Sequence, residues 1–157
     1  MILGCVLLLS YKTIGIHPPV ETFSAKQCLI ANIFFESRGE SKKGMQAVAA
    51  VTMNRVNHKN YPDSVCAVVF QKKQFSWTHE QTSSRILAVL KGDTSWMQLK
   101  DRQSYKIAVD IVSSPRLHYM QLLPKNAVFY HSVKVKPYWV KHKIQVARIG
   151  RHVFYRS

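Results

Sequence analysis

Residues 24–56 read SAKQCLIANIFFESRGESKKGMQAVAAVTMNRV and contain the signals for two consecutive helices. Ser24-Ala25-Lys26-Gln27 has the form of a capping box, in which serine and glutamine side chains satisfy free amides at a helix start. Apolar residues at helical spacing follow, so one side of this helix is predicted to be buried. Gly39 is a natural stop, which places Glu36 in the last turn or just beyond it. A second helix is predicted from about Lys43 to Val56.

The remaining chain predicts further helices and then strands. Helical signals occur at Ser64 to Phe70, at Thr82 to Leu90 and at Tyr105 to Val112, the last ended by Pro115. β-Branched and aromatic residues predict strands at Ala127 to Tyr130, Ile144 to Ile149 and Val153 to Tyr155, with Gly150 in a turn. We therefore expect an α+β fold: a single, mainly helical domain over residues 21–157 with a small C-terminal antiparallel β-sheet.

The charge is strongly positive. The 157 residues include 23 Lys and Arg against 8 Asp and Glu, which gives a net charge of +15. No acidic residue follows Asp110, whereas residues 111–157 carry nine Lys and Arg and four His. The C-terminal third is predicted to form an electropositive face. Nucleic acid, an anionic membrane and a bacterial envelope are all possible partners for it, and charge alone does not rank them.

The three cysteines, Cys5, Cys28 and Cys66, are an odd number and form no C-x-x-C pair. Neither a zinc site nor a disulfide scaffold is indicated, and we expect Cys28 and Cys66 to be buried as small hydrophobic residues. Residues 1–20 begin with an apolar stretch that is short for a membrane span. We interpret them as an export signal or signal anchor, and the alternative is a helix packed on the domain.

Two carboxylates lie beside aromatic residues in Phe34-Phe35-Glu36-Ser37-Arg38-Gly39-Glu40. Apolar neighbours raise the pKa of a carboxyl group, which lets it act as a general acid near neutral pH. Glycoside cleavage needs such an acid to protonate the departing oxygen. The alternative from spacing alone is that Glu36 and Glu40 are a solvated pair at a helix end.

Several ordered motifs resemble the SleB/CwlJ-type family of cell wall hydrolases, whose members include spore-cortex-lytic enzymes and endolysin-like phage and proteobacterial proteins. The resemblance extends from about Cys28 to Tyr155. It rests on these blocks: Glu36-Ser-Arg-Gly-Glu40, Gly44 to Val56, Gln74-Phe-Ser-Trp77, Phe129-Tyr-His131, Pro137-Tyr-Trp139 and Ile149 to Tyr155.

The resemblance implies a lysozyme-like fold and a peptidoglycan-degrading enzyme that cleaves the β-1,4 bond between N-acetylmuramic acid and N-acetylglucosamine. It implies Glu36 as the general acid/base, with a lytic transglycosylase favoured over a hydrolytic muramidase. Glu40 would be a second carboxylate that orients the site or contacts substrate. The implied place of action is the bacterial cell wall, in the periplasm or outside the cell, and we expect a monomer without cofactors.

The candidate substrate-binding residues combine amide, hydroxyl and aromatic surfaces suited to sugars. They are Gln74, Phe75, Ser76, Trp77, Tyr130 and His131. Core packing is an equally good interpretation of Phe75, whereas we favour substrate contact for Trp77. Trp139 is expected to lie in the core.

Two other classes of function remain open at this point. An N-acetylmuramoyl-L-alanine amidase would need a metal, but His79-Glu80 is followed by Ser83 where a second zinc-binding histidine would stand, and we expect no catalytic metal. A non-catalytic basic module that binds the envelope or nucleic acid would fit the charge, but it would leave the Glu36 motif unexplained.

Overall fold

A computed structural model describes residues 23–157 of the chain, and the predicted export segment at residues 1–20 lies outside these described residues. Within them, no helix has both the length and the apolar character needed to cross a bilayer. The elements in chain order are α1 (Ala25–Ser37), α2 (Lys42–Val56), α3 (Val65–Val69), α4 (Trp77–Glu80), α5 (Ser83–Lys91), α6 (Leu99–Ser113), α7 (Leu117–Met120), β1 (Ala127–Ser132), η2 (Tyr138–His142), β2 (Ile144–Ile149) and β3 (His152–Arg156).

Helix α1 begins and ends as the sequence predicts. The Ser24 side chain accepts a hydrogen bond from the Gln27 amide, and the Gln27 side chain accepts one from the Ser24 amide, which completes the capping box. The helix ends at Ser37, and Gly39 follows with a φ of +84°, a conformation that glycine adopts without strain. Glu36 is therefore confirmed in the last turn.

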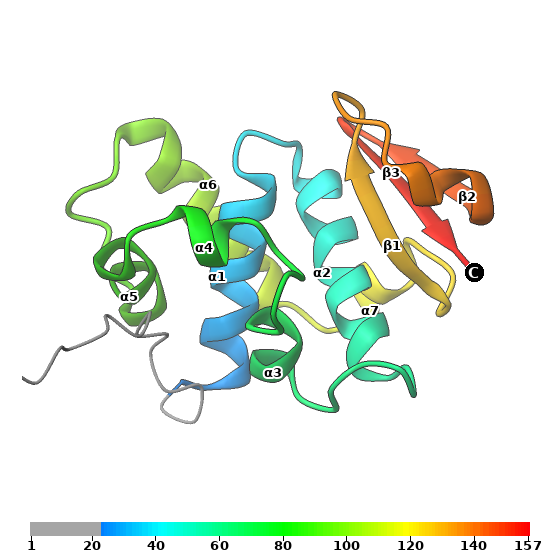
Figure 1. The fold of residues 1–157 in the computed structure, drawn as a ribbon. Helices are drawn as coiled ribbons and strands as arrows, with labels where there is room; N and C mark the ends of the chain where they lie inside the picture. Colours follow the sequence, from blue (N-terminus) through cyan, green and yellow to red (C-terminus); the bar gives the residue numbers. More distant parts are fainter. Residues whose placement is uncertain (1–22) are drawn as a thin grey trace, which may run out of the picture.

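Helices α1 and α2 are buried more completely than an amphipathic pattern implies. In α1 the buried residues include Asn32 and Ser37 as well as apolar ones, and in α2 every residue from Met45 to Arg55 except Gln46 is buried. Figure 1 shows the reason, since α2 lies between α1 on one side and the sheet on the other. The prediction that one side of α1 is buried was therefore too narrow.

A buried hydrogen-bond network joins these two helices to α4. The Asn32 side-chain amide donates to Thr52 Oγ1 at 3.0 Å, and its carbonyl oxygen accepts from the Trp77 indole at 3.2 Å. Thr52 in turn donates to the carbonyl of Val48 within α2. Because buried polar groups are costly when unpaired, this network fixes how α1, α2 and α4 sit together.

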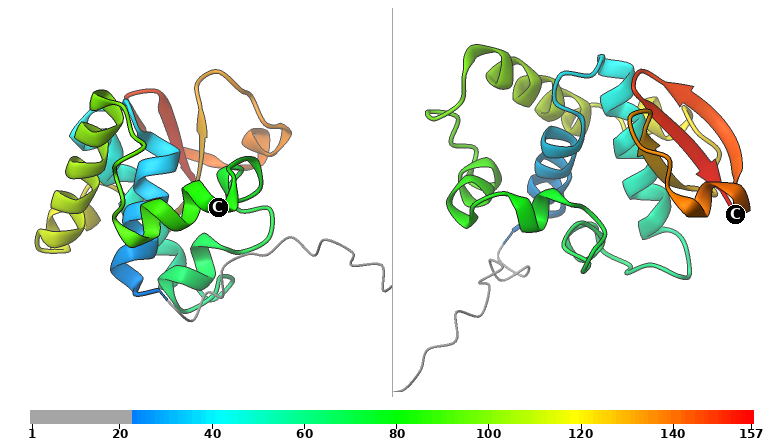
Figure 2. Two further views of the ribbon diagram at one scale, coloured as in Figure 1. Left: turned by 90° about the vertical axis from the view of Figure 1, so that its left-hand side faces the viewer. Right: turned by 45° about the horizontal axis from the view of Figure 1, so that its top comes forward.

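The remaining helices follow their predicted signals. Side chains of Ser64 and Thr82 cap α3 and α5, and α6 ends at Ser113 before Pro115. Helices α5 and α6 pack on α1 from the side away from the sheet (Figures 1 and 2). The helical part therefore surrounds α1 and leaves one face of α2 for the strands.

The sheet is antiparallel with the order β1-β3-β2, so the last strand is the central one. Phe154 of β3 is completely buried, and β1 packs on α2. Gly150 turns the chain between β2 and β3 with a φ of +58°. The prediction of an α+β fold with many helices and a small C-terminal antiparallel sheet is confirmed.

The cysteine prediction was wrong in one respect. Cys28 and Cys66 are both buried, as expected, but they form a disulfide that joins α1 to the short helix α3. The pairing depends on two segments that are 38 residues apart in sequence, with Cα atoms 5.3 Å apart. The cysteine count could not reveal this contact, because it arises from tertiary packing.

We expect the disulfide to stabilise the fold. A cross-link that closes a loop of 38 residues contributes about 4 kcal/mol through the lost entropy of the unfolded chain. The double variant Cys28→Ala/Cys66→Ala should show a free energy of unfolding that is lower by about this amount in urea titrations. Dithiothreitol should lower the stability of the wild-type protein similarly and leave the double variant unchanged. Equal stability of the two oxidised proteins would contradict the expectation.

Candidate active site

A cleft of about 450 Å³ lies between the helical part and the sheet, at the end of α1. Its walls come from the C-terminal turns of α1 and α2, the loop before α4, strand β1 and the segment that follows it. The lining residues are Glu36, Arg55, Lys73, Gln74, Phe75, Ser76, Phe129, Tyr130, His131, Ser132, Val135, Trp139 and His152. Six of the eight predicted site residues are among them, and Glu40 and Trp77 are not.

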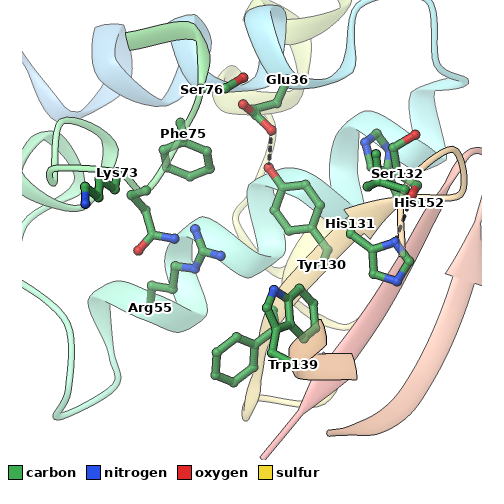
Figure 3. A pocket seen from close by; sticks show the side chains of 13 residues that line it. Glu36, Arg55, Lys73, Phe75, Ser76, Tyr130, His131, Ser132, Trp139 and His152 are labelled. Carbon is green, nitrogen blue, oxygen red and sulfur yellow. Dashed lines mark hydrogen bonds between the residues drawn. The ribbon is translucent and has the colours of Figure 1, made fainter. Parts of the chain in front are cut away.

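Glu36 projects from the last turn of α1 into this cleft and meets Tyr130 of β1. The Tyr130 hydroxyl donates a hydrogen bond to Glu36 Oε2 at 2.7 Å (Figure 3). The two residues are 94 positions apart in sequence, so the bond joins the helical part to the sheet across the cleft. Glu36 is the only carboxylate among the residues that line the cleft.

The surroundings of Glu36 favour its protonated form. Burial raises the pKa of Glu36 above its usual value, and the Tyr130 hydrogen bond and the positive charge of Arg55 offset only part of this effect. The negative charge of Glu80 adds a smaller upward contribution to the pKa. The net shift of the Glu36 pKa is upward, which is the direction that a general acid requires near neutral pH.

Arg55 is the principal cleft residue to which the sequence analysis assigned no role. Arg55 is only 4% exposed, and its Nε donates to the Val128 carbonyl at 2.9 Å. The guanidinium also lies over the rings of Phe75 and Tyr130. An arginine close to a run of small and apolar helix positions was the available signal, because a buried cation is rare without a specific reason.

The loop before α4 contributes three of the predicted sugar-contacting residues. Gln74, Phe75 and Ser76 line the cleft, and Ser76 is exposed to solvent there. Lys73 precedes them with a φ of 62°, a left-handed conformation that is uncommon for residues other than glycine. The loop thus directs a short polar and aromatic stretch toward the acid.

Trp77 does not take the predicted substrate-contacting position. It is 3% exposed, stacks on Phe35 with ring centroids 4.6 Å apart, and donates its indole N–H to Asn32. Its role is to anchor the loop from within the core. Polar residues on both sides suggested a surface tryptophan, but Trp77 is the first residue of the short helix α4 and its side chain is buried there.

The sheet side of the cleft is an aromatic cluster. His131 stacks on Tyr155 and shares a hydrogen bond of 2.9 Å between its Nε2 and the Tyr155 hydroxyl. Trp139 of η2 packs edge-on against both rings, is only partly buried and lines the cleft. The expectation that Trp139 belongs to the core was wrong, because the 3-10 helix that carries it places the ring against His131 and Tyr155 at the wall of the cleft.

Glu40 lies outside the cleft and binds the turn between β2 and β3. Its carboxylate accepts hydrogen bonds from the backbone N–H and the Nε of Arg151, and its side chain is 4% exposed. Burial opposes ionisation of Glu40, but these bonds hold its pKa below the usual value. A Cβ atom at Gly150 would lie 2.1 Å from Glu40 Oε2, so only glycine fits there. Glu40 thus fastens the sheet to the segment between α1 and α2.

His152 is the cleft residue nearest in sequence to this anchor. It is 7% exposed, its Nδ1 has no hydrogen-bond partner, and burial lowers its pKa. Among the described residues no group of three or more His, Cys, Asp or Glu side chains could hold a metal ion. The cleft can therefore offer one carboxylic acid, hydroxyl and amide groups, ring faces and a buried cation.

Comparison with known proteins agrees with this arrangement. Residues 39–155 match the family model described as Cell Wall Hydrolase, so the match begins three residues after Glu36. The spore cortex-lytic enzyme of Oceanobacillus iheyensis is 29% identical over 130 residues, which are 80% of this chain and 40% of that protein. The Bacillus cereus enzyme of the same name is 30% identical over 131 residues, or 80% and 42%. The chain thus spans about two fifths of these relatives.

Two solved structures have a similar fold. The catalytic domain of the Bacillus cereus SleB protein superimposes with a TM-score of 0.50 at 25% identity, covering 85% of this chain and 92% of that domain. The catalytic domain of the germination-specific lytic transglycosylase SleB from Bacillus anthracis gives 0.51 at 24% identity, covering 84% and 93%, and supports the fold alone. The predicted fold class is confirmed, and the family match over residues 39–155 shows that this chain belongs to the cell wall hydrolase family.

Proposed function

We propose that this chain cleaves the glycan of peptidoglycan at the β-1,4 bond that follows N-acetylmuramic acid, with Glu36 as the acid that protonates the departing oxygen. The observation that carries the proposal is that Glu36 is the single carboxyl group of the cleft and that burial raises its pKa. Its hydrogen-bond partner is the hydroxyl of Tyr130. Family membership supports peptidoglycan as the substrate. Gln74, Phe75, Ser76, Tyr130 and His131 are proposed to contact the sugars.

The same geometry favours a lytic transglycosylase over a hydrolase. A hydrolytic glycosidase uses a second carboxylate, either as a nucleophile or as a base for water. Glu40 is bound to Arg151 outside the cleft, and Glu80 is not among the residues that line the cleft. In the proposed reaction Glu36 gives its proton to the leaving oxygen as the C1–O bond breaks. Glu36 then accepts the proton of the muramic 6-hydroxyl as that oxygen bonds to C1, leaving a 1,6-anhydro end.

The proposed place of action is outside the cytoplasm. The wall is located there, and the Cys28–Cys66 disulfide belongs to proteins that fold in oxidising compartments. The chain is proposed to reach the wall either by export or by release at cell lysis.

Replacing the acid tests the mechanism directly. Glu36→Gln should lower turnover of purified sacculi by at least about 100-fold, because general acid catalysis contributes that much or more, while the protein still folds and binds sacculi. Glu80→Gln is the matched control, since Glu80 affects Glu36 only through its charge. Glu40→Gln should weaken activity less than Glu36→Gln. Mass spectrometry of the wild-type products should show new ends that are one water lighter than hydrolytic ends. An active Glu36→Gln protein would remove the proposal, and reducing ends alone would replace transglycosylation with hydrolysis.

Tyr130→Phe should shift the pH dependence of cleavage. The Tyr130 hydroxyl stabilises the Glu36 anion and so lowers the pKa of Glu36, and its removal should raise that pKa. Activity requires protonated Glu36, so the alkaline limb of kcat/KM should move to higher pH. Tyr155→Phe is the matched control, because it loses a hydroxyl that bonds to His131 and should leave the limb in place. A limb that stays fixed or moves to lower pH in Tyr130→Phe would contradict the role of Glu36.

We also propose that a basic surface beside the cleft holds the protein on the anionic envelope. We define it by four exposed cations on the sheet side, Lys134, Lys136, Lys141 and Arg148. The first two flank Val135, which lines the cleft. No carboxylate of residues 23–157 neutralises them, since the ion pairs within this range join Lys42 to Asp110 and Arg151 to Glu40.

Reversing these four charges should weaken binding to sacculi by about tenfold or more and reduce its sensitivity to salt. The matched control reverses four exposed lysines of the helical part and gives the same net charge. These lysines are Lys26, Lys59, Lys91 and Lys100. Sedimentation of sacculi across a salt series measures both proteins. Equal losses would show that only net charge matters, and the proposed surface would then be wrong.

A further inference from the structure

His152 is a buried histidine in the wall of the cleft that has no part in the proton transfer proposed above. It lies in β3, the central strand of the sheet, and is 7% exposed. Its ring makes a T-shaped contact with the Tyr130 ring, with centroids 5.4 Å apart, and its side chain lines the cleft (Figure 3). Hydrogen-bonded strands on both sides fix the backbone at this position. The imidazole is therefore held in one place beside the groups that are proposed to bind sugar.

The hydrogen-bonding capacity of His152 is unused within residues 23–157. Nδ1 is buried and has no partner there. Nε2 is not buried in this way and forms no hydrogen bond with the described residues, so it is open to the cleft that the side chain lines. Buried polar side chains normally have a partner, and a phenylalanine ring would fill a similar space without leaving a polar atom unpaired. The unused imidazole therefore points to a group that arrives with a ligand.

The burial of Nδ1 indicates which nitrogen of His152 carries the proton. Burial lowers the pKa of His152, so the ring is neutral near neutral pH and has a single N–H. A proton on Nδ1 would be a buried donor without an acceptor, which is rarer in proteins than an underused acceptor. The proton is therefore assigned to Nε2, and the ring presents one neutral N–H donor to the cleft.

An acetamido group matches this donor and its surroundings. Its carbonyl oxygen accepts a hydrogen bond, and its methyl group can pack on the aromatic rings that line the cleft, among them Tyr130 and Trp139. A sugar hydroxyl has no apolar part to cover these rings. Both aminosugars of peptidoglycan carry an N-acetyl group, which stays free when a stem peptide is attached to muramic acid. The donor thus fits a group that every sugar unit of the proposed substrate offers.

We propose that His152 donates a hydrogen bond from Nε2 to the N-acetyl carbonyl oxygen of a sugar bound in the cleft. The inference rests on the proposed function for the identity of the glycan. It makes His152 a binding residue that selects N-acetylated sugars, separate from the proton transfer at Glu36. A glycan whose amino groups lack the acetyl group would leave the donor unpaired.

Calorimetry in an inactive background tests this role. The Glu36→Gln protein would be titrated with a tetrasaccharide of alternating N-acetylglucosamine and N-acetylmuramic acid, and with the same tetrasaccharide carrying N-trifluoroacetyl groups. The fluorines weaken the carbonyl as an acceptor and leave the charge of the ligand unchanged. The affinity for the acetyl ligand divided by that for the trifluoroacetyl ligand should fall about threefold after His152→Phe, since a single hydrogen bond contributes a factor of this size. His152→Gln should keep part of this ratio, because its amide N–H can stand near the position of Nε2.

His118→Phe is the matched control for the loss of an imidazole. His118 is exposed in α7 and does not line the cleft, so this variant should keep the full ratio. A purely structural role of His152 would weaken the binding of both ligands equally. The ratio therefore separates a contact with the acetyl group from an effect on the fold.

An unchanged ratio in His152→Phe would overturn the inference. If His152→Phe fails to fold by circular dichroism, His152→Asn decides, because its shorter amide stands near Nδ1 and cannot reach the position of Nε2. An unchanged ratio in that protein would overturn the inference in the same way. Failure here is distinct from failure of the proposed function. Cleavage of sacculi by an enzyme whose ratio does not depend on His152 removes only this role, and a ratio that depends on His152 without cleavage removes only the enzymatic proposal.

Discussion

The contact between α1 and α2 gives the groups of the cleft their positions. Glu36 stands in the last turn of α1, and Asn54 and Arg55 stand near the end of α2. The Asn54 side chain donates to the carbonyls of Pro124 and Ala127, and Arg55 donates to Val128, so α2 carries strand β1 on its outer face. Once the two helices pack, the acid and the sheet that bears its hydroxyl partner are placed together. The cleft therefore depends on a rigid core and not on loops alone.

Much of the fold could be predicted because its signals are local. The capping box at Ser24, the stop at Gly39 and the cap at Ser64 each act within a few residues of the backbone they affect. The strands likewise follow from β-branched and aromatic runs around the turn at Gly150. The position of Glu36 near a helix end followed from the same signals. Its role as the acid stays a proposal, because position alone does not establish chemistry.

The errors concern contacts between segments that are distant in sequence. The partner of Cys28 is 38 residues away, and the anchoring of Trp77 depends on Asn32 in another helix. Glu40 was predicted to orient the site or to contact substrate, and the structure places it outside the cleft, where Arg151 holds it at the sheet turn. Arg55 showed only that a cation occurred in an apolar helix, since the rings around it come from three other segments. Composition and periodicity carry no information about such partners.

The close approach of Gly150 to the Glu40 carboxylate limits how this domain can vary. A hairpin turn usually accepts several small or polar residues, but here even a methyl group would overlap a carboxylate oxygen at 2.1 Å. The carboxylate cannot retreat easily, because the Arg151 backbone and side chain both hold it. The turn is therefore fixed at two neighbouring residues, because Gly150 leaves room for the carboxylate and Arg151 supplies the groups that bind it. A redesign that lengthens the sheet must keep this glycine or lose the contact between Glu40 and Arg151 that connects the helices to the strands.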